Sequence, residues 1–362
     1  MRRPHRPLLR RPDHPALITG GAGFIGTNVA ARLLEDGGRV RIFDNLSRAG
    51  VEANLQWLCD TYGDGVETII ADVRDQTAIA RAVDGASAIF HFAAQVAVTS
   101  SLDEPLFDFA VNAGGTLNLL EAVRALAAPP PMIFTSTNKV YGDLDDVELV
   151  PEGDRYVPAD GSIRDAGISE ARPIAFHSPY GCSKGAADQY VLDYARTFGI
   201  PAVVFRMSCI YGPHQFGTED QGWVAHFLIR AMDDRPITIY GDGLQVRDVL
   251  YVDDLVHAFL LAQSAIDTIA GEAFNIGGGP SRTTSLVELV ETISQLEQRP
   301  IPLTYDAWRE ADQRYYVSDT RKFREATGWS PRVSVADGVR ALRDWLAAAR
   351  SAAAAEAAGV AS

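Results

Sequence analysis

Tyr180 and Lys184 are the two residues whose types and spacing most directly indicate chemistry in this sequence. They lie at positions i and i+4 of a segment, residues 179–198, whose pattern predicts a helix, so both side chains share one face. A tyrosine hydroxyl is a poor base at neutral pH, because its reference pKa is about 10. An ammonium group one helical turn away favours the phenolate, which allows the tyrosine to take a proton from a substrate hydroxyl.

Lysine is scarce in this chain, which sets the pair apart. The sequence has 33 basic residues, of which only Lys139, Lys184 and Lys322 are lysine, and it has 12 tyrosines. A Tyr–Lys pair at this spacing is expected by chance only about 0.1 times in such a chain. Arginine cannot replace the lysine, because its planar guanidinium does not act as a compact point charge. We therefore predict that Tyr180 and Lys184 are catalytic.

A hydroxyl group beside Tyr180 completes the catalytic set that we predict. Residues 134–142 have the sequence FTSTNKVYG and end an expected strand at 132–136. A hydroxyl at this strand end would lie next to Tyr180 and hold the reacting oxygen, and we assign that role to Thr137. Lys139, two residues further on, is either a substrate contact or a structural residue.

The elements that must position these residues alternate between strands and helices. This alternation indicates βαβ units and a parallel sheet with helices on both faces. Residues 142–177 break the pattern and are expected to be irregular, as a flap or functional loop. A further helix is expected at 285–296, and the alanine-rich end from 347 is expected to be a helical extension or a frayed tail. The other expected strands are 16–19, 39–43, 67–71, 88–92 and 202–207, and the other expected helices are 24–35, 52–62, 76–83 and 106–126.

Three glycines join the first expected strand to the first expected helix. Gly20, Gly23 and Gly26 would allow a tight turn, a close approach of the backbone to a pyrophosphate, and close helix–strand packing. The helix N-terminus would present free N–H groups to the phosphates. Asp44 ends the second strand, where a carboxylate would bind the adenosine ribose and repel a 2′-phosphate, so we expect NAD rather than NADP. Two alternatives stay open: Arg48 would hold a 2′-phosphate, or Asp44 is only a turn residue before Asn45.

The ends of the next two strands extend this predicted cofactor site. Asp72 and Val73 follow the third strand, where the adenine edge would lie. Ala93, Ala94 and Gln95 follow the fourth, where small residues would let the nicotinamide approach. The predicted cofactor-binding residues are Gly20, Gly23, Phe24, Ile25, Gly26, Asp44, Asn45, Ser47, Arg48, Asp72, Val73, Ala93, Ala94, Gln95, Tyr180 and Lys184.

Composition narrows the classes of partner. The chain has 362 residues and a formal net charge of −14, so its body should repel nucleic acid and anionic membranes. No stretch of about 18 apolar residues is present, so no transmembrane helix is expected. The basic, proline-rich residues 1–14 lack an apolar core and are expected to be a disordered leader. The cysteines, Cys59, Cys182 and Cys209, are too scattered for a disulfide framework or a zinc site. We expect a cytoplasmic location and no metal.

The order of these motifs along the chain resembles the extended short-chain dehydrogenase/reductases, the NAD-dependent epimerase/dehydratase family. The order is TGGAGFIG, Asp44, S-T-x-x-V-Y-G, Y-x-x-x-K, RDVLYVDD and NIGGG, and it covers about residues 15–345. The resemblance implies a Rossmann-type doubly wound α/β fold with a smaller C-terminal lobe that binds a nucleotide sugar. It places the NAD-binding domain at 15–207 with 249–279, the substrate lobe at 208–248 with 280–346, and the tail at 347–362.

The same resemblance implies further site residues. Asn112 matches a cofactor contact of the family. Ser208, Arg247 and Arg314 are implied to contact the nucleotide diphosphate, which arginines bind well. The full set implied to bind substrate is Thr99, Asn138, Lys139, Ser208, Gln221, Arg247 and Arg314. Homologous enzymes pair through two helices per subunit, which would be 106–126 and 180–198 here, so a homodimer is expected unless these apolar faces belong to the core.

The absence of residues that related reactions require narrows the possible type of reaction. A 4,6-dehydratase needs Asp-Glu directly after the threonine, where this chain has Asn138 and Lys139, and the glutamate of a decarboxylase is missing too. Epimerisation remains: bound NAD oxidises a carbinol to a keto-sugar and hydride returns to the opposite face. Residues 44–48, 136–141, 177–190 and 220–224 resemble the CDP-paratose 2-epimerases (tyvelose epimerases), which implies an NAD-dependent isomerase acting at C2 of CDP-paratose or another nucleotide hexose or heptose.

Three alternatives stay open at this point. A 4-epimerase of the UDP-glucose/galactose type would use the same residues with the sugar docked differently. A nucleotide-sugar dehydrogenase or ketoreductase would need an exchangeable cofactor rather than tightly bound NAD+. A catalytically inactive NAD-binding scaffold would typically lose Tyr or Lys, whereas Thr137, Tyr180 and Lys184 are all present. Nothing in composition or spacing specifies the nucleotide base or the sugar.

Overall fold

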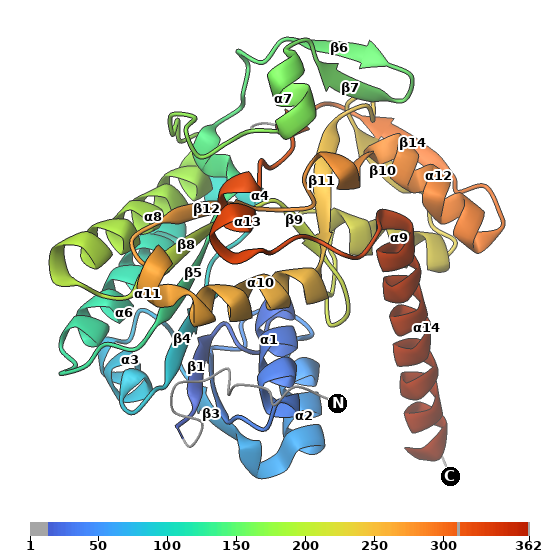
Figure 1. Ribbon diagram of the computed structural model, residues 1–362. Helices are drawn as coiled ribbons and strands as arrows, with labels where there is room; N and C mark the ends of the chain where they lie inside the picture. The colour runs from blue at the N-terminus through green and yellow to red at the C-terminus, as the bar shows by residue number, and fades with distance from the viewer. Residues whose placement is uncertain (1–13, 310–311, 361–362) are drawn as a thin grey trace, which may run out of the picture.

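The computed structural model of the protein describes residues 14–309 and 312–360, and its centre is a parallel sheet (Figure 1). Within these residues, seven parallel strands are ordered β12-β8-β5-β4-β1-β2-β3. The chain reverses its direction of travel across the sheet between the neighbours β1 and β4, which is the arrangement of a doubly wound Rossmann-type fold. The α/β prediction is thereby confirmed. The strands are β1 (Ala16–Thr19), β2 (Val40–Asp44), β3 (Val66–Ile70), β4 (Ala88–His91), β5 (Met132–Thr137), β8 (Ala202–Met207) and β12 (Ala273–Ile276).

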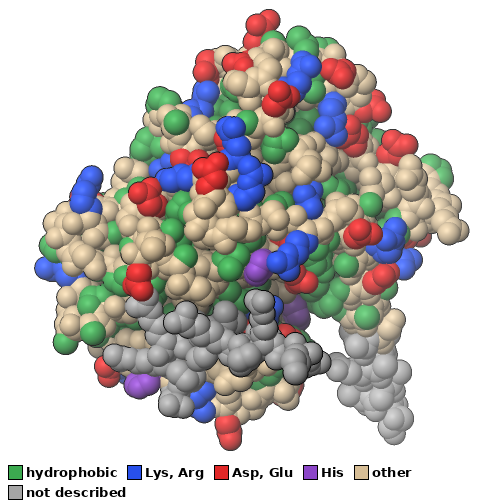
Figure 2. Space-filling view, viewed as in Figure 1, with side chains coloured by type: hydrophobic (Ala, Val, Ile, Leu, Met, Phe, Trp, Pro, Cys, Tyr) green, Lys and Arg blue, Asp and Glu red, His purple; other side chains and the backbone are tan. Residues whose placement is uncertain are grey.

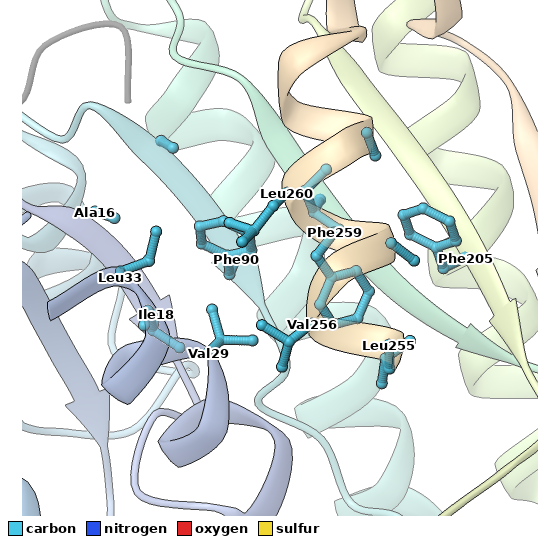
Figure 3. Close-up of a cluster of buried hydrophobic side chains, with 14 of the residues drawn as sticks. Ala16, Ile18, Val29, Leu33, Phe90, Phe205, Leu255, Val256, Phe259 and Leu260 are labelled. Carbon is cyan, nitrogen blue, oxygen red and sulfur yellow. The ribbon is translucent and has the colours of Figure 1, made fainter. Parts of the chain in front are cut away.

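Helices cover both faces of this sheet, because its central strands are apolar on both sides. One face packs against α1 (Phe24–Glu35) and α10 (Val252–Ser264), with α2 (Val51–Tyr62) beside them. In Figure 3, α10 directs Val256 and Phe259 between Phe90 of β4 and Phe205 of β8. The opposite face packs against α3 (Gln76–Val83), α6 (Gly115–Arg124) and α8 (Ser178–Phe198). The sheet is therefore fixed from both sides, and its strand ends are held rigidly.

The long helix expected at 106–126 is not continuous. It consists of α5 (Pro105–Phe109), a π-helical turn at Ala110–Gly114 and α6, and a short helix α4 (Val98–Asp103) precedes it. A π turn accommodates one extra residue, and such turns are frequent at functional sites. Hydrophobic periodicity alone could not reveal the interruption, because the pattern continues on both sides of it.

A smaller second core lies beside the carboxyl edge of the sheet. β11 (Val246–Tyr251) pairs with β9 (Cys209–Tyr211), β13 (Thr283–Ser285) and β15 (Tyr315–Tyr316), while β10 (Ile237–Tyr240) pairs with β14 (Leu303–Asp306). Its helices are α9 (Trp223–Met232), α12 (Leu286–Glu297) and the start of α14 (Val335–Val360). Ser285 caps α12 and forms a capping box with Glu288, so this helix begins one residue later than expected. The domain boundaries stay a prediction.

The expectation that residues 142–177 are irregular is wrong for part of them. They contain a hairpin of β6 (Leu149–Glu152) and β7 (Arg155–Pro158), followed by α7 (Gly161–Ala166). Arg155 binds Glu288 on α12 through two guanidinium nitrogens, which fixes the hairpin to the second core. The short strands have mixed polar and apolar residues on a largely exposed surface, so they leave little periodic signal.

The surface and the chain ends complete the description. The alanine-rich end is helical, since α14 continues to Val360 and projects away from the body (Figure 1). Most of the expected leader, residues 1–13, lies outside the described residues. Acidic and basic side chains are interspersed over the face shown in Figure 2. In the part of the chain that the structure describes, no helix has the length and apolarity needed to cross a membrane.

Candidate active site

A cavity of about 650 Å³ runs along the carboxyl edge of the sheet. Residues that follow β1, β2, β3, β4, β5 and β8 line it, which is the edge where open α/β sheets bind ligands. Every cofactor-binding residue predicted from the strand ends and the Tyr–Lys pair lies in its wall. They are Gly20, Gly23, Phe24, Ile25, Gly26, Asp44, Asn45, Ser47, Arg48, Asp72, Val73, Ala93, Ala94, Gln95, Tyr180 and Lys184.

The glycine-rich turn leaves a cradle that side chains would fill. Gly20 has φ +68°, and a Cβ placed there would lie 2.7 Å from the backbone nitrogen of Ala93. A Cβ on Gly26 would overlap the carbonyl oxygen of Gly20. The turn therefore needs glycine for its own geometry, and it leads directly into the N-terminus of α1. This cradle suits the pyrophosphate of a dinucleotide, whose negative charge the helix N-terminus favours.

Asp44 at the end of β2 is held in place by backbone groups. Its carboxylate accepts hydrogen bonds from the Ala22 amide at 3.1 Å and the Leu46 amide at 2.9 Å. Burial raises the pKa of Asp44, and these two hydrogen bonds oppose the rise. Asn45 donates to Asp72 at 2.8 Å, which connects the ends of β2 and β3. The carboxylate is thus anchored in the cavity wall, where it can accept hydrogen bonds from a ribose hydroxyl.

Thr137, Tyr180 and Lys184 come together in the middle of the cavity wall. Removal of the Tyr180 hydroxyl from water raises its pKa to about 12, and a hydrogen bond with the Thr137 hydroxyl opposes that rise. The Lys184 ammonium donates to the Thr135 carbonyl at 2.6 Å and lies 4.4 Å from the centre of the Phe134 ring. Burial lowers the pKa of Lys184 to about 8. β5 and the first turns of α8 therefore bring the Tyr180 phenol, the Thr137 hydroxyl and the Lys184 ammonium close together.

Asn112 lies behind this wall rather than in it. Its side chain accepts a hydrogen bond from the Gln95 amide at 2.9 Å and donates to the Gln95 carbonyl at 3.1 Å. It therefore shapes the loop after β4, whose residues line the cavity. A cofactor contact through Gln95 is compatible with this position.

The residues predicted to bind substrate divide into two groups. Asn138, Ser208 and Gln221 line the cavity, whereas Thr99, Lys139, Arg247 and Arg314 do not. Arg247 is buried and donates to Asp312 at 2.7 Å and to the Gln313 carbonyl. Lys139 lies 3.9 Å from Asp312, and burial lowers its pKa to about 8.

A hydrogen bond connects the Arg247 cluster to the cavity wall. Asn138 donates to the Gln313 side chain at 3.2 Å, which connects the wall to the Arg247 cluster. Arg314 lies further away, 4.9 Å from the centre of the Trp308 ring. Thr99 is exposed on α4, where its neighbour Ser100 faces the cavity instead.

A segment between β9 and α9 crosses from the second core to the cofactor side, and we call residues 213–222 the strap. The Pro213 carbonyl accepts from Asn28 at 2.9 Å, and the His214 carbonyl accepts from Asn54 at 3.2 Å. The His214 ring lies 4.4 Å from Trp57 on α2 and 5.2 Å from Trp345 on α14. Further along the strap, Gln221 accepts a hydrogen bond from Arg48. The Arg48 guanidinium, which in the alternative interpretation would hold a 2′-phosphate, is therefore already hydrogen-bonded to Gln221.

Several cavity residues were missed by sequence reasoning. They lie on or between α4 and α5, on the strap, and at the start of α9, and only residues 220–224 carry a sequence resemblance, which assigned no role to Trp223 or Val224. Proximity in the fold reveals their place in the cavity wall, because their positions depend on how the second core packs against the sheet. The main ones are Ser100, Glu104, Phe107, Gln215, Thr218, Trp223 and Val224.

Comparison with known proteins agrees with this geometry. Residues 16–277 match the model of the NAD dependent epimerase/dehydratase family. The chain belongs to this family. An epimerase/dehydratase of Salmonella typhi, CDP-paratose 2-epimerase, is 45% identical over 91% of this chain and 98% of the relative.

Two solved members of the epimerase/dehydratase family share the fold. The UDP-glucose 4-epimerase of Thermotoga maritima, solved with UDP-glucose, gives a TM-score of 0.79 at 31% identity and covers 92% of this chain and 99% of that one. The UDP-glucose 4-epimerase of Thermus thermophilus, solved with NAD, gives 0.76 at 31% identity over 91% and 98%. NAD is thus the cofactor of this epimerase/dehydratase, and the glycine cradle and Asp44 fit it.

Proposed function

We propose that the protein is an NAD-dependent epimerase that inverts C2 of a nucleotide-diphosphate sugar, CDP-paratose or a related hexose or heptose. The arrangement of Tyr180, Thr137 and Lys184 in one cavity wall carries this proposal. Asn138 and Lys139 follow Thr137, so the acid pair that a 4,6-dehydratase needs is not at these positions. Similarity to CDP-paratose 2-epimerase over almost its whole length supports the choice of C2.

The catalytic steps of this proposal assign one task to each side chain. When bound, NAD supplies a reversible hydride acceptor for the sugar carbon. Tyr180 takes the proton from the sugar hydroxyl and later returns it, while the Thr137 hydroxyl holds the reacting oxygen. The desolvated phenol is a weak acid until positive charge approaches it, and Lys184, with a pKa of about 8, is mostly an ammonium at neutral pH. Tyr180 is therefore expected to transfer a proton only when cofactor and substrate are bound.

A 4-epimerase of the UDP-glucose type is the second candidate, and the similarity to two UDP-glucose 4-epimerase structures favours it. Sugar NMR in deuterated water decides between the two. Purified protein without added cofactor is incubated with CDP-, UDP-, GDP- and ADP-linked hexoses. We expect inversion at C2 without deuterium incorporation. Inversion at C4 would establish the second candidate instead. Turnover only when NAD is added, with NADH accumulating, contradicts both.

We also propose a homodimer that pairs the α5 and α8 faces of two copies. The alternative that these apolar residues belong to the core does not hold for Leu106 and Phe109, which are 85% and 59% exposed on α5. Tyr190 on α8 is 45% exposed as well. Such a set of exposed large apolar residues is typical of a protein interface. Sedimentation should give the mass of two chains, and Leu106→Glu with Phe109→Glu should give one. A monomer before mutation contradicts the proposal.

A further inference from the structure

Asp108 is a buried carboxylate directly behind the catalytic residues. It lies on α5 between the exposed Phe107 and Phe109, yet its own side chain is 0% exposed. Its Oδ1 atom accepts a hydrogen bond from the Asn112 amide at 3.1 Å. Its Oδ2 atom is shielded from solvent and has no hydrogen-bond partner among the described residues. A carboxylate in this state is costly to bury, so its presence needs a reason beyond packing.

A short hydrogen-bond network connects Asp108 to the catalytic turn of α8. The Asn112 amide that binds Asp108 also donates to the Ser183 hydroxyl at 3.0 Å. Ser183 lies next to Lys184, and its hydroxyl donates to the Tyr180 carbonyl at 3.2 Å. The π-helical turn that begins after α5 carries Asn112, so the interruption of the helix places the amide between α5 and α8.

Two other titratable groups lie near the pair. Asp188, one turn after Lys184, forms two hydrogen bonds with Arg206 at 2.9 and 3.0 Å, and its charge also raises the pKa of Lys184. His91 lies between the Thr19 and Thr116 hydroxyls, and burial lowers its pKa to about 3, so it is neutral. Asp108 forms no salt bridge with another described residue. Burial raises its pKa, and a hydrogen bond from Ser183 and the charge of Lys184 oppose that rise. The Asp108 charge in turn raises the pKa of Tyr180 and of Lys184.

We propose that Asp108 is a positioning residue whose carboxylate, held by Asn112 beside Ser183, keeps Tyr180 and Lys184 protonated together in the resting enzyme. A fixed negative charge disfavours a phenolate and favours an ammonium, so both groups hold their protons more strongly. The site then releases a proton only when the positive charge of the oxidised cofactor and the substrate are in place. This inference rests on the proposed function, because it assigns a proton-transfer role to Tyr180.

The decisive variant is Asp108→Asn, which keeps the size and the acceptor for Asn112 but removes the charge. Both limbs of the pH profile of kcat/KM should move to lower pH, by about half a unit or more. Asp108→Ser, which also keeps an acceptor, should give the same shift if Asp108→Asn folds poorly. Asp103→Asn, which neutralises an exposed carboxylate on α4, is the matched control and should leave both limbs in place.

A second readout separates this inference from the proposed function. Near-ultraviolet absorbance reports phenolate formation in the NAD-loaded enzyme, and subtraction of a Tyr180→Phe variant isolates Tyr180. Asp108→Asn should lower the pH at which the Tyr180 phenolate appears, even where the chosen sugar is not turned over. A lower kcat with unmoved limbs and an unmoved phenolate titration would show a structural role only and overturn the proposal. An equal shift in Asp103→Asn overturns it too.

Discussion

At the cofactor end of the cavity, the wall is built from backbone and small side chains at the ends of consecutive strands, such as Gly20, Asp44 and Ala93. At the substrate end, the candidate contacts come from side chains on separate elements, and Arg247 and Arg314 are already engaged with Asp312 and Trp308. The first end is fixed by local backbone geometry. The second depends on how the second core packs against the sheet, so we expect its contacts to rearrange when substrate binds.

We expect the largest effect of a single substitution at Tyr180, where the cofactor end and the substrate end of the cavity meet. Tyr180→Phe removes the phenol hydroxyl while keeping the ring, and should lower kcat by about a thousandfold, since general acid–base groups contribute on this scale. The bound NAD content and the melting temperature should stay near those of the unchanged protein. Tyr190→Phe, on the exposed face of α8, is the matched control and should keep full turnover. Turnover that survives Tyr180→Phe would assign the proton transfer to another group.

A substitution at the cofactor end tests whether backbone geometry is what binds NAD. Gly20→Ala should yield protein that purifies with little NAD, because the added Cβ meets the Ala93 backbone in addition to the strain at φ +68°. Gly37→Ala separates the two causes, since Gly37 has φ +82° with no atom within 4 Å of an added Cβ. That control should lose only about 1 kcal/mol of unfolding free energy and keep its NAD. Equal NAD loss in both would refute the cradle.

The smallest effect is expected at the substrate end. Arg314→Ala should raise KM for the nucleotide sugar about tenfold with little change in kcat, as expected when one charge-assisted hydrogen bond is lost. Steady-state kinetics measure both constants. Arg324→Ala, an exposed arginine on α13 (Arg321–Thr327), is the matched control. An unchanged KM in Arg314→Ala would show that this end does not rearrange to bring Arg314 to the diphosphate.

The same contrast explains what the sequence could predict. Gly20, Asp44, Thr137 and the Tyr180–Lys184 pair are tied to strand ends and helix turns, so their spacing determines their placement. The π turn that positions Asn112, the hairpin at 149–158 and the cavity face of Ser100 depend on packing between distant segments. No local pattern encodes such packing. Asp108 could not be predicted for the same reason. An aspartate is rarely buried, and here it is buried while its apolar neighbours Phe107 and Phe109 are exposed.

The strap carries a consequence for stability. It belongs by sequence to the second core, but it is anchored to α1 and α2 through Asn28, Asn54 and Trp57. The sheet and the second core therefore share part of their contacts, and they should unfold in one cooperative transition rather than two. Because residues of the sheet and of the strap both line the cavity that would hold NAD, cofactor binding should raise the melting temperature of the whole molecule at once. Loss of the cofactor should likewise destabilise the sheet and the second core together.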